Sequence, residues 1–308
     1  MHLKQEIIIL FLLTGFFLTL AGCQYLESKN KHFKLNPPLK KIYKYSSIKT
    51  SEHNNKYPAS DSPDFFPNRN LDTFKLNFSL ESIASHDSII NYKLTFIDFY
   101  INKNKKPFKI ILKNADPSQQ FFSKDPFVLY DSIGSIIRGK SVEVIINYRG
   151  IVKQVTGVDE LVKYIAGTSS ENENHVKTMV SDYLSANALK DLLNRFLSAV
   201  PGLKVKEGDK WVRNVTLVTK APVKLSNLYV FDQQNNDTAS VSIQSIISAE
   251  QSEGGTVYMK GKGKGIATIN YSTGMPYLFE TRSETETTTT EKQYEYINKE
   301  HFLVKEYH

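Results

Sequence analysis

The sequence of 308 residues predicts an α+β fold: a large curved antiparallel β-sheet (an open half-barrel) with about three central helices packed on its concave face. Apolar and polar residues alternate, as in half-buried strands, over residues 40–156 and again over residues 211–305. Between these regions, residues 158–200 carry apolar residues at helical spacing. The links between successive strands are short, which favours antiparallel pairing, and strands that flank a helical insert are typical of an α+β domain.

The N-terminus carries an apolar run that is too short to cross a bilayer. Residues 7–20 would form a helix of roughly 21 Å, whereas the hydrocarbon core is about 30 Å thick. A short apolar run that ends in small residues is typical of a cleaved signal peptide, which we place at residues 1–22. The alternatives are an uncleaved anchor helix and an ordinary signal peptide whose nearby cysteine is incidental.

The run closes on Leu20-Ala21-Gly22-Cys23, which contains the only cysteine of the chain. These four residues resemble the lipobox of bacterial lipoproteins, in which the cysteine sulfur receives a diacylglycerol and the chain is cut before it. The resemblance implies that Cys23 is lipidated and holds the mature protein on a membrane. Residue 24 is Gln, not the Asp that resembles an inner-membrane retention signal. We therefore expect a lipid-anchored protein of the bacterial cell envelope, on the periplasmic face of the outer membrane.

The segment after Cys23 is polar and basic. Residues 23–39 end in Pro37-Pro38 and predict a flexible linker between the membrane and a single domain over residues 40–308. Either its lysines bind anionic lipid head groups or they keep the tether solvated; they are residues 29, 31, 34, 40, 41, 44 and 49. The net charge of +7 does not indicate a nucleic-acid partner, because the basic residues are scattered and no recognition motif is present.

Long alternating runs predict the strands of both β regions. Residues 76–80 and 89–101 alternate on either side of a turn-like segment at residues 85–88, which predicts a long hairpin. A second hairpin is predicted around Ser272-Thr273-Gly274, between strands over residues 256–271 and 276–291.

Three apolar stripes predict the helices. The first follows Gly157, the second spans about residues 172–184, and the third has Ser185 as its N-cap and stops at Pro201-Gly202. The third has the strongest amphipathic pattern, with an apolar stripe of Leu189, Leu192, Leu193 and Phe196. This stripe must be buried, either against the sheet or against a ligand.

A run of glycines in the second β region leaves one strand face bare. Gly261, Gly263 and Gly265 share this face, while Lys262 and Lys264 lie on the other. A face without side chains permits close approach by a neighbouring element. We expect the central helices to pack on it, and a wall of a ligand site is the alternative.

Three short motifs carry a resemblance to a known family: Asn147-Tyr148-Arg149-Gly150-Ile151-Val152, Gly208-Asp209-Lys210-Trp211 and Tyr271-Ser272-Thr273-Gly274-Met275-Pro276. With the order of strands, helices and strands, they resemble an uncharacterised domain-of-unknown-function family of Bacteroidota lipoproteins, over most of residues 40–305. The family implies no activity. The layout also resembles periplasmic lipid-carrying lipoproteins, in which a curved sheet over helices leaves an apolar cavity.

The sequence contains no recognisable catalytic or metal-binding motif. The histidines are spread singly, and no serine lies in a Gly-x-Ser-x-Gly turn. Glu280, Glu284 and Glu286 share a strand face that we interpret as the wet face of the sheet, not as an acid–base pair. We expect no cofactor and no metal. Three triplets resemble the O-glycosylation signal of Bacteroidota and would place sugars on Ser88, Ser132 and Thr238.

These observations favour a non-enzymatic lipoprotein that binds an apolar or amphipathic ligand between its sheet and its helices. The residues expected to face the ligand are Leu189, Leu192, Leu193, Phe196, Gly261, Gly263 and Gly265. Two other functions stay open: an interaction or assembly module of the cell envelope, and a hydrolase.

Overall fold

The structure is a computed structural model that describes residues 32–55, 70–103, 106–107, 134, 136–168, 173–217, 222–251, 257–289 and 295–307. Within these residues, 64% are in strands and 18% in helices. The predicted signal peptide, Cys23 and Ser132 lie outside the described residues. No helix in the described ranges is both long and apolar enough to cross a membrane.

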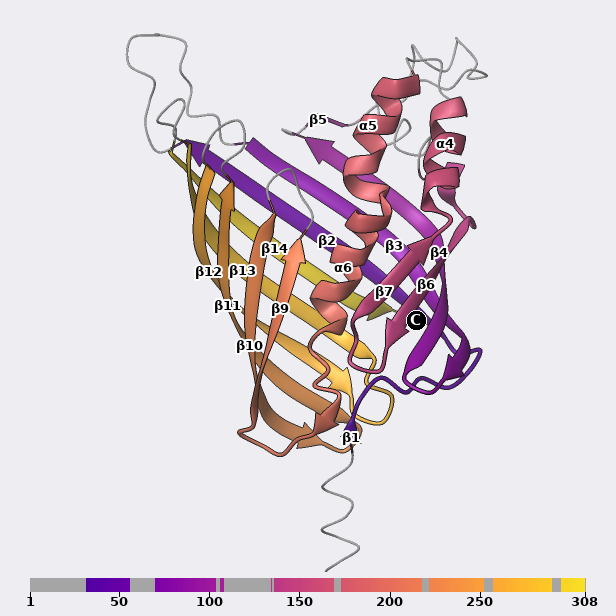
Figure 1. Ribbon diagram of the computed structural model, residues 1–308, viewed down its shortest axis with the longest axis vertical. Helices are drawn as coiled ribbons and strands as arrows, with labels where there is room; N and C mark the ends of the chain where they lie inside the picture. Colours follow the sequence, from indigo (N-terminus) through magenta and orange to yellow (C-terminus); the bar gives the residue numbers. More distant parts are fainter. Residues whose placement is uncertain are drawn as a thin grey trace, which may run out of the picture.

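One twelve-stranded sheet dominates the fold (Figure 1). Its order is β7-β6-β4-β3-β2-β14-β13-β12-β11-β10-β9, with the short β5 paired to β4. The bounds are β2 (Ile42–Asn55), β3 (Asn70–His86), β4 (Ile89–Lys103), β5 (Lys106–Pro107), β6 (Ser141–Asn147), β7 (Val152–Thr156), β9 (Lys210–Leu217), β10 (Val223–Asn235), β11 (Thr238–Gln251), β12 (Val257–Asn270), β13 (Pro276–Thr289) and β14 (Glu295–Tyr307). Both predicted hairpins are present, as β3–β4 and β12–β13.

The prediction of an α+β half-barrel with about three central helices is wrong in its balance and its helix count. The open sheet outweighs the helical part, and helices α4 (Val158–Thr168), α5 (Glu173–Leu184) and α6 (Ala186–Leu197) form only two rods. The second rod consists of α5 and α6, which run end to end (Figure 1). Strands are longer than their apolar alternation indicates: β10 continues through the polar residues 232–235, and only Asn236 and Asp237 form the turn into β11.

The joint between α5 and α6 explains the miscounted helices. Ser185 has an extended backbone and its hydroxyl accepts a hydrogen bond from the Ala188 amide, so the predicted N-cap is real. Yet the Ser185 amide donates to the Ser181 carbonyl (3.1 Å) and the Leu189 amide donates to the Ser185 carbonyl (3.0 Å). The helical hydrogen-bond pattern therefore continues on both sides, and a single extended residue does not reverse the chain.

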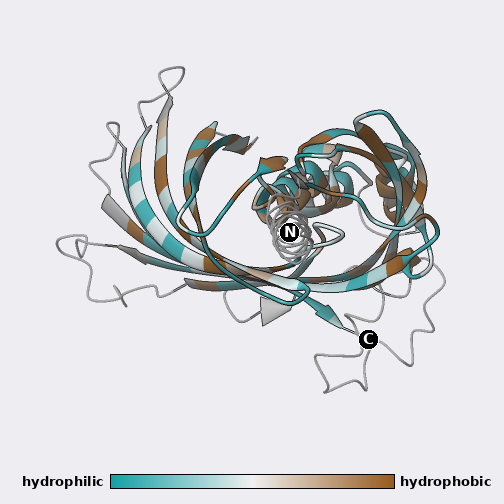
Figure 2. Ribbon diagram, turned by 90° about the horizontal axis from the view of Figure 1, so that it is seen from below, coloured by the Kyte–Doolittle hydropathy of each residue, from teal (hydrophilic) through white to brown (hydrophobic). Residues whose placement is uncertain are grey.

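The α6 half of this rod lies between the two edges of the open sheet. The sheet curves around the helical rods, as seen from below in Figure 2. On one side, the Val152 amide of edge strand β7 donates to Oδ1 of Asn194 in α6 (2.8 Å). On the other side, Arg213 of edge strand β9 donates to the carbonyl of Pro201, just after α6 (2.5 Å). Edge strand β7 is thus hydrogen-bonded to α6 and edge strand β9 to the segment that follows it, while the two edge strands do not pair with each other.

The N-terminal part of the described chain seals one end of the molecule, which we call the lower end (Figure 1). There, β1 (His32–Phe33) pairs with β8 (Leu203–Lys204). The Asn36 amide donates to Thr273 in the β12–β13 turn (2.8 Å), and the Lys40 amide donates to Ser82 of β3 (2.7 Å). Phe33 and Leu35 are buried. Residues 32–39, which we had placed in the flexible linker, thus pack on the domain because these two apolar side chains complete its core.

Candidate functional site: a cavity above the apolar core

Strand register divides the concave face into an apolar lower part and a polar upper part. Near the lower end, one row across seven strands contains only one polar residue; it comprises Phe231, Val241, Ala267, Phe279, Val304, Ser47 and Leu76. Four residues further up, the row across eight strands is polar, apart from one glycine; it comprises Arg213, Asn227, Ser245, Gly263, Ser283, Glu300, Ser51 and Asp72. The lower row is buried core, so a polar ligand can reach only the upper part.

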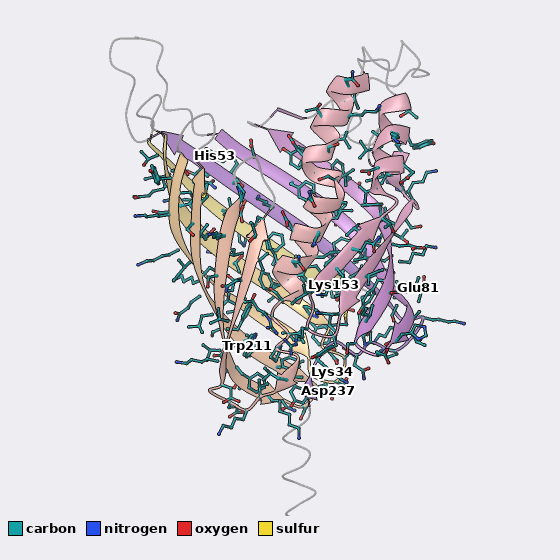
Figure 3. The ribbon with its side chains drawn as sticks, viewed as in Figure 1. Lys34, His53, Glu81, Lys153, Trp211 and Asp237 are labelled. Carbon is teal, nitrogen blue, oxygen red and sulfur yellow. The ribbon has the colours of Figure 1, made fainter. Side chains whose placement is uncertain are left out.

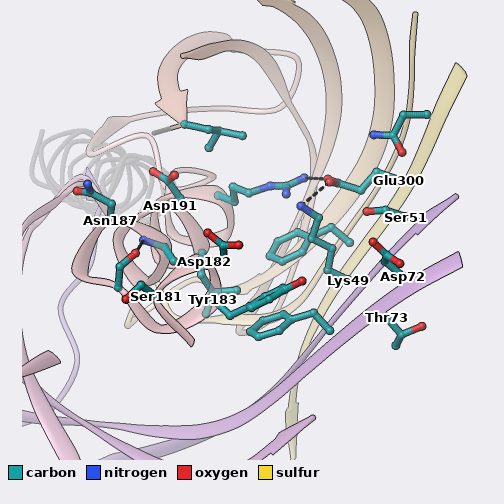
Figure 4. Close-up of a pocket in the computed structure, with 18 of the residues that line it drawn as sticks. Lys49, Ser51, Asp72, Thr73, Ser181, Asp182, Tyr183, Asn187, Asp191 and Glu300 are labelled. Carbon is teal, nitrogen blue, oxygen red and sulfur yellow. Dashed lines mark hydrogen bonds and ion pairs between the residues drawn. The ribbon is translucent and has the colours of Figure 1, made fainter. Parts of the chain in front are cut away.

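A cavity of about 580 Å³ lies at this upper level, between the α5–α6 rod and strands β2, β3 and β14 (Figure 4). Its polar lining includes Lys49, Ser51, His53, Asp72, Asp182, Asn187, Asp191, Arg195, Asn298 and Glu300. Its apolar lining includes Phe74, Tyr183, Ala188, Leu192, Leu217 and Phe302. The cavity therefore offers charged and apolar walls to the same molecule.

Glu300 of β14 is the centre of a charge cluster in this cavity. Its carboxylate binds the Lys49 ammonium (2.9 Å) and the Arg195 guanidinium, as the dashed lines in Figure 4 mark. Arg195 also lies over the ring of Phe302, 4.2 Å from its centre. Burial alone would raise the pKa of Glu300, but the attraction of Arg195 and Lys49 outweighs it and holds this pKa far below its usual value.

An aromatic pair forms another wall of the cavity. Phe74 of β3 stacks on Tyr183 of α5, with ring centres 5.4 Å apart and an interplanar angle of 17°. Burial, with a smaller contribution from the nearby carboxylates of Asp72 and Asp182, raises the pKa of Tyr183 to about 12. Tyr183 is therefore a neutral hydroxyl at physiological pH, with its ring available for apolar contact.

Of the α6 residues that we expected to face a ligand, only Leu192 lines the cavity. Leu189, Leu193 and Phe196 are completely covered by the core beneath it. Phe196 packs on Tyr45 and Phe78, with ring centres 5.4 Å and 6.4 Å away. The stripe is thus mainly a packing surface for the sheet.

The glycine face is filled by the neighbouring strand β13, not by a helix or by the cavity. A Cβ atom on Gly261 would lie 2.4 Å from Cγ2 of Thr285, and one on Gly265 would lie 2.1 Å from the Glu280 carbonyl oxygen. Gly263 occupies the β12 position of the polar row. The bare strand face therefore serves close strand packing on the concave side of the sheet.

Sequence reasoning missed Lys49, Arg195 and Glu300. Lys49 was grouped with the tether lysines, yet its parity in β2 places it on the same face as Tyr43 and Tyr45. Glu300 lies two residues before the buried Phe302 in the same strand, so the two side chains share a face, and this pattern could have assigned Glu300 to the inner face. Their mutual contact depends on β2 pairing with β14, which no local pattern encodes.

The remaining candidate residues lie away from the cavity. Ser88 is exposed in the β3–β4 turn, and Thr238 opens β11, where its hydroxyl donates to the Asn235 carbonyl (3.1 Å). On the outer face, Glu280 contacts Arg282 and His301 at 3.0 Å each, and Glu284 contacts Lys299 at 3.6 Å. Among the described residues, no group of three His, Cys, Asp or Glu side chains could hold a metal ion.

Fold and site together define a mainly β protein with a half-polar cavity inside an open sheet. Residues 86–276, more than half of the chain, match the model of a family described as a family of unknown function (DUF6263), and the chain belongs to that family. The prediction of an unknown-function family is thereby confirmed, whereas its link to Bacteroidota lipoproteins stays a prediction. No curated protein matches the sequence.

Two solved structures show only weak similarity. One is lipovitellin, from a study of its lipid–protein interactions: the TM-score is 0.44 at 9% identity, over 88% of this chain and 25% of that chain. This chain therefore spans about a quarter of the lipovitellin chain. The other is an outer membrane channel from Pseudomonas putida F1, with a TM-score of 0.19 at 7% identity, over 89% of this chain and 98% of that chain. Neither score supports an argument about this protein.

Proposed function

We propose that this protein is a lipid-anchored protein of the bacterial cell envelope that binds an amphipathic molecule in the cavity, without a catalytic step. The observation that carries the proposal is the mixed lining of the 580 Å³ cavity, where the charge cluster of Lys49, Arg195 and Glu300 faces the aromatic pair of Phe74 and Tyr183. Cavities of roughly 300–1,000 Å³ with apolar walls and a few polar groups are typical of small-molecule sites.

The charged wall argues for an amphipathic ligand over a purely apolar one. An apolar molecule would displace water from Lys49, whose side chain is 41% exposed, without replacing its hydrogen bonds. A ligand with a polar head group can satisfy that ammonium while its apolar part lies on Phe74, Tyr183 and Leu192.

Binding is tested with an amphipathic fluorescent probe, anilinonaphthalene sulfonate, and with native mass spectrometry of protein purified from its own envelope. We expect a retained small molecule and saturable probe binding. Ala188→Trp would fill the cavity and weaken probe binding at least tenfold, whereas Lys190→Trp, on the same helix but outside the lining, would leave it unchanged. Equal binding by both variants would exclude the cavity as the site. A bound protein partner without a small molecule would favour an assembly module.

The anchor is part of the proposal and rests on the resemblance of residues 20–23 to a lipobox. Two or more acyl chains hold a protein on a bilayer stably, so the native chain should sediment with the outer membrane. Cys23→Ser should abolish lipid attachment and move the protein out of that fraction, whereas Ser28→Ala should change neither. A Cys23→Ser chain that stays in the outer membrane would refute the lipid anchor.

A further inference from the structure

The first described residues and the cavity lie at opposite ends of the molecule. The described chain begins at the lower end, where β1 lies, and Figure 3 shows Lys34 at that end and the cavity residue His53 near the other. Along β13, seven residues separate Pro276 at the lower end from Ser283 in the polar row, a distance of about 23 Å. Eight residues separate Cys23 from His32, and this tether spans at most about 30 Å when extended, so it keeps the lower end near the membrane but does not by itself orient the domain.

The lower end presents lysines and exposed apolar side chains together. Two segments contribute to it: residues 34–42, which follow β1 and reach Glu81 of β3 at Ile42, and residues 203–206, which include β8, the partner of β1, and precede Glu207. Five exposed lysines lie in them: Lys34, Lys40, Lys41, Lys204 and Lys206. Three apolar side chains in the same segments are also exposed, Leu39 by 58%, Ile42 by 54% and Leu203 by 45%. We call these two segments the basic end surface.

We propose that the basic end surface docks on anionic lipid head groups, so that the cavity opens away from the membrane that holds the protein. This inference rests on the proposed lipid anchor, because the tether brings this surface to the bilayer. Lysine ammonium groups attract anionic head groups, and exposed leucine and isoleucine side chains insert at the interface. Acidic residues border this surface as well: Glu81 pairs with Ile42, Glu207 and Asp209 follow β8, and Figure 3 shows Asp237 near Lys34, so the docking depends on the five lysines together with the exposed apolar side chains.

In this orientation, a ligand enters the cavity from the periplasmic side, not from the anchoring leaflet. The lower end of the molecule therefore contacts the bilayer, and ligand exchange takes place at the upper end, where the cavity lies. The lipid source is an anionic phospholipid, such as phosphatidylglycerol.

The test uses the native lipidated chain in vesicles of phosphatidylethanolamine and phosphatidylglycerol. Since Cys23 is the only cysteine, Leu203→Cys and Thr288→Cys give single labelling sites at the lower and upper ends. A quencher on the lipid head groups should quench the fluorophore at 203 several-fold more than the one at 288. Equal quenching, or stronger quenching at 288, would overturn the orientation.

Charge variants test the role of the lysines. Replacing Lys34, Lys40 and Lys204 by Gln should reduce quenching at 203 on anionic vesicles and leave it unchanged on neutral phosphatidylcholine vesicles. The matched control replaces Lys260, Lys262 and Lys264, exposed on the outer face of β12, and should have no effect. An equal effect of both triple variants would refute a specific docking surface. Sedimentation of the native chain with membranes tests the anchor separately, so a chain that sediments but lacks orientation overturns only this inference.

Discussion

Arg195 in α6 and Glu300 in β14 form an ion pair that ties the helical rod to the middle of the sheet. Both side chains are largely buried, with exposed fractions of 13% and 14%. Their desolvation is offset by mutual attraction, by Lys49 on the second carboxylate oxygen and by the Phe302 ring beneath Arg195. The pair therefore lies between the apolar core and the cavity, and it joins α6 to β14 at that level.

Removal of Arg195 should strongly destabilise the fold. Arg195→Ala leaves the buried Glu300 carboxylate with Lys49 alone, and breaking a buried pair in this way costs about 3–5 kcal/mol of unfolding free energy. Lys49→Ala is the control: its side chain is 41% exposed, so the loss should stay below about 1 kcal/mol. Urea unfolding of the two variants checks this, and equal losses would contradict the central role of Arg195.

The same cluster predicts a loss of stability in acid. The pKa of Glu300 is far lower in the folded state than in the unfolded chain, where a Glu titrates near about 4.3. Above that pH the contribution of the pair is fully present, and it is lost as the pH falls toward the lower folded-state pKa, because the unfolded chain binds the proton first.

Glu300→Gln isolates this contribution. The wild-type unfolding free energy should fall more steeply than that of the variant as the pH is lowered below about 4.3, since the other carboxylates are common to both proteins. Urea midpoints measured across this range provide the comparison. Parallel curves would show that Glu300 titrates normally.

Much of the sheet could be predicted because alternation is a local property. The runs at 76–80 and 89–101 became the hairpin β3–β4, and the turn at Ser272-Thr273-Gly274 connects β12 to β13. The helical rods were miscounted because a real cap at Ser185 looks the same in sequence whether or not the chain turns there.

The site could be predicted only in part, since it depends on distant pairings. Leu192 was identified through its helical stripe, but Lys49 and Glu300 meet only because β2 pairs with β14. Likewise, the glycines of β12 indicated close packing, but only the register with β13 shows which neighbour fills the space.

Removing the hydroxyl of Tyr229 and removing that of Tyr45 should change the unfolding free energy differently, because only the first hydroxyl belongs to a buried hydrogen-bond network. The Tyr229 hydroxyl shares a hydrogen bond with the Ser198 hydroxyl at the end of α6 (2.8 Å) and accepts one from the side-chain Nδ2 of Asn227 (3.1 Å). The Tyr45 hydroxyl is equally buried but has no hydrogen-bond partner among the described residues.

Tyr229→Phe should therefore lower the unfolding free energy by about 1–3 kcal/mol, because Asn227 and Ser198 lose a buried partner. Tyr45→Phe should be neutral or slightly stabilising, since it removes a polar atom that is desolvated without compensation. Thermal unfolding of both variants measures the difference. A destabilised Tyr45→Phe protein would mean that its hydroxyl has a partner, such as a buried water.

The three glycines of β12 should differ in their tolerance of alanine, in an order set by β13. A Cβ atom on Gly265 would lie 2.1 Å from the Glu280 carbonyl oxygen, and one on Gly261 would lie 2.5 Å from that of Glu284. Both oxygens belong to the backbone of a strand held on both sides, so they cannot move aside cheaply.

At Gly263 the nearest atom to an added Cβ is Cβ of Ser283, at 3.0 Å, so a small shift suffices. Gly265→Ala and Gly261→Ala should thus each lose about 1–3 kcal/mol of unfolding free energy through overpacking. Gly263→Ala should lose less, because the gain of about 0.4–1 kcal/mol from a less flexible unfolded chain offsets a mild contact. Urea unfolding of the three variants gives the order, and a Gly265→Ala protein as stable as the wild type would show that β12 and β13 are further apart than described.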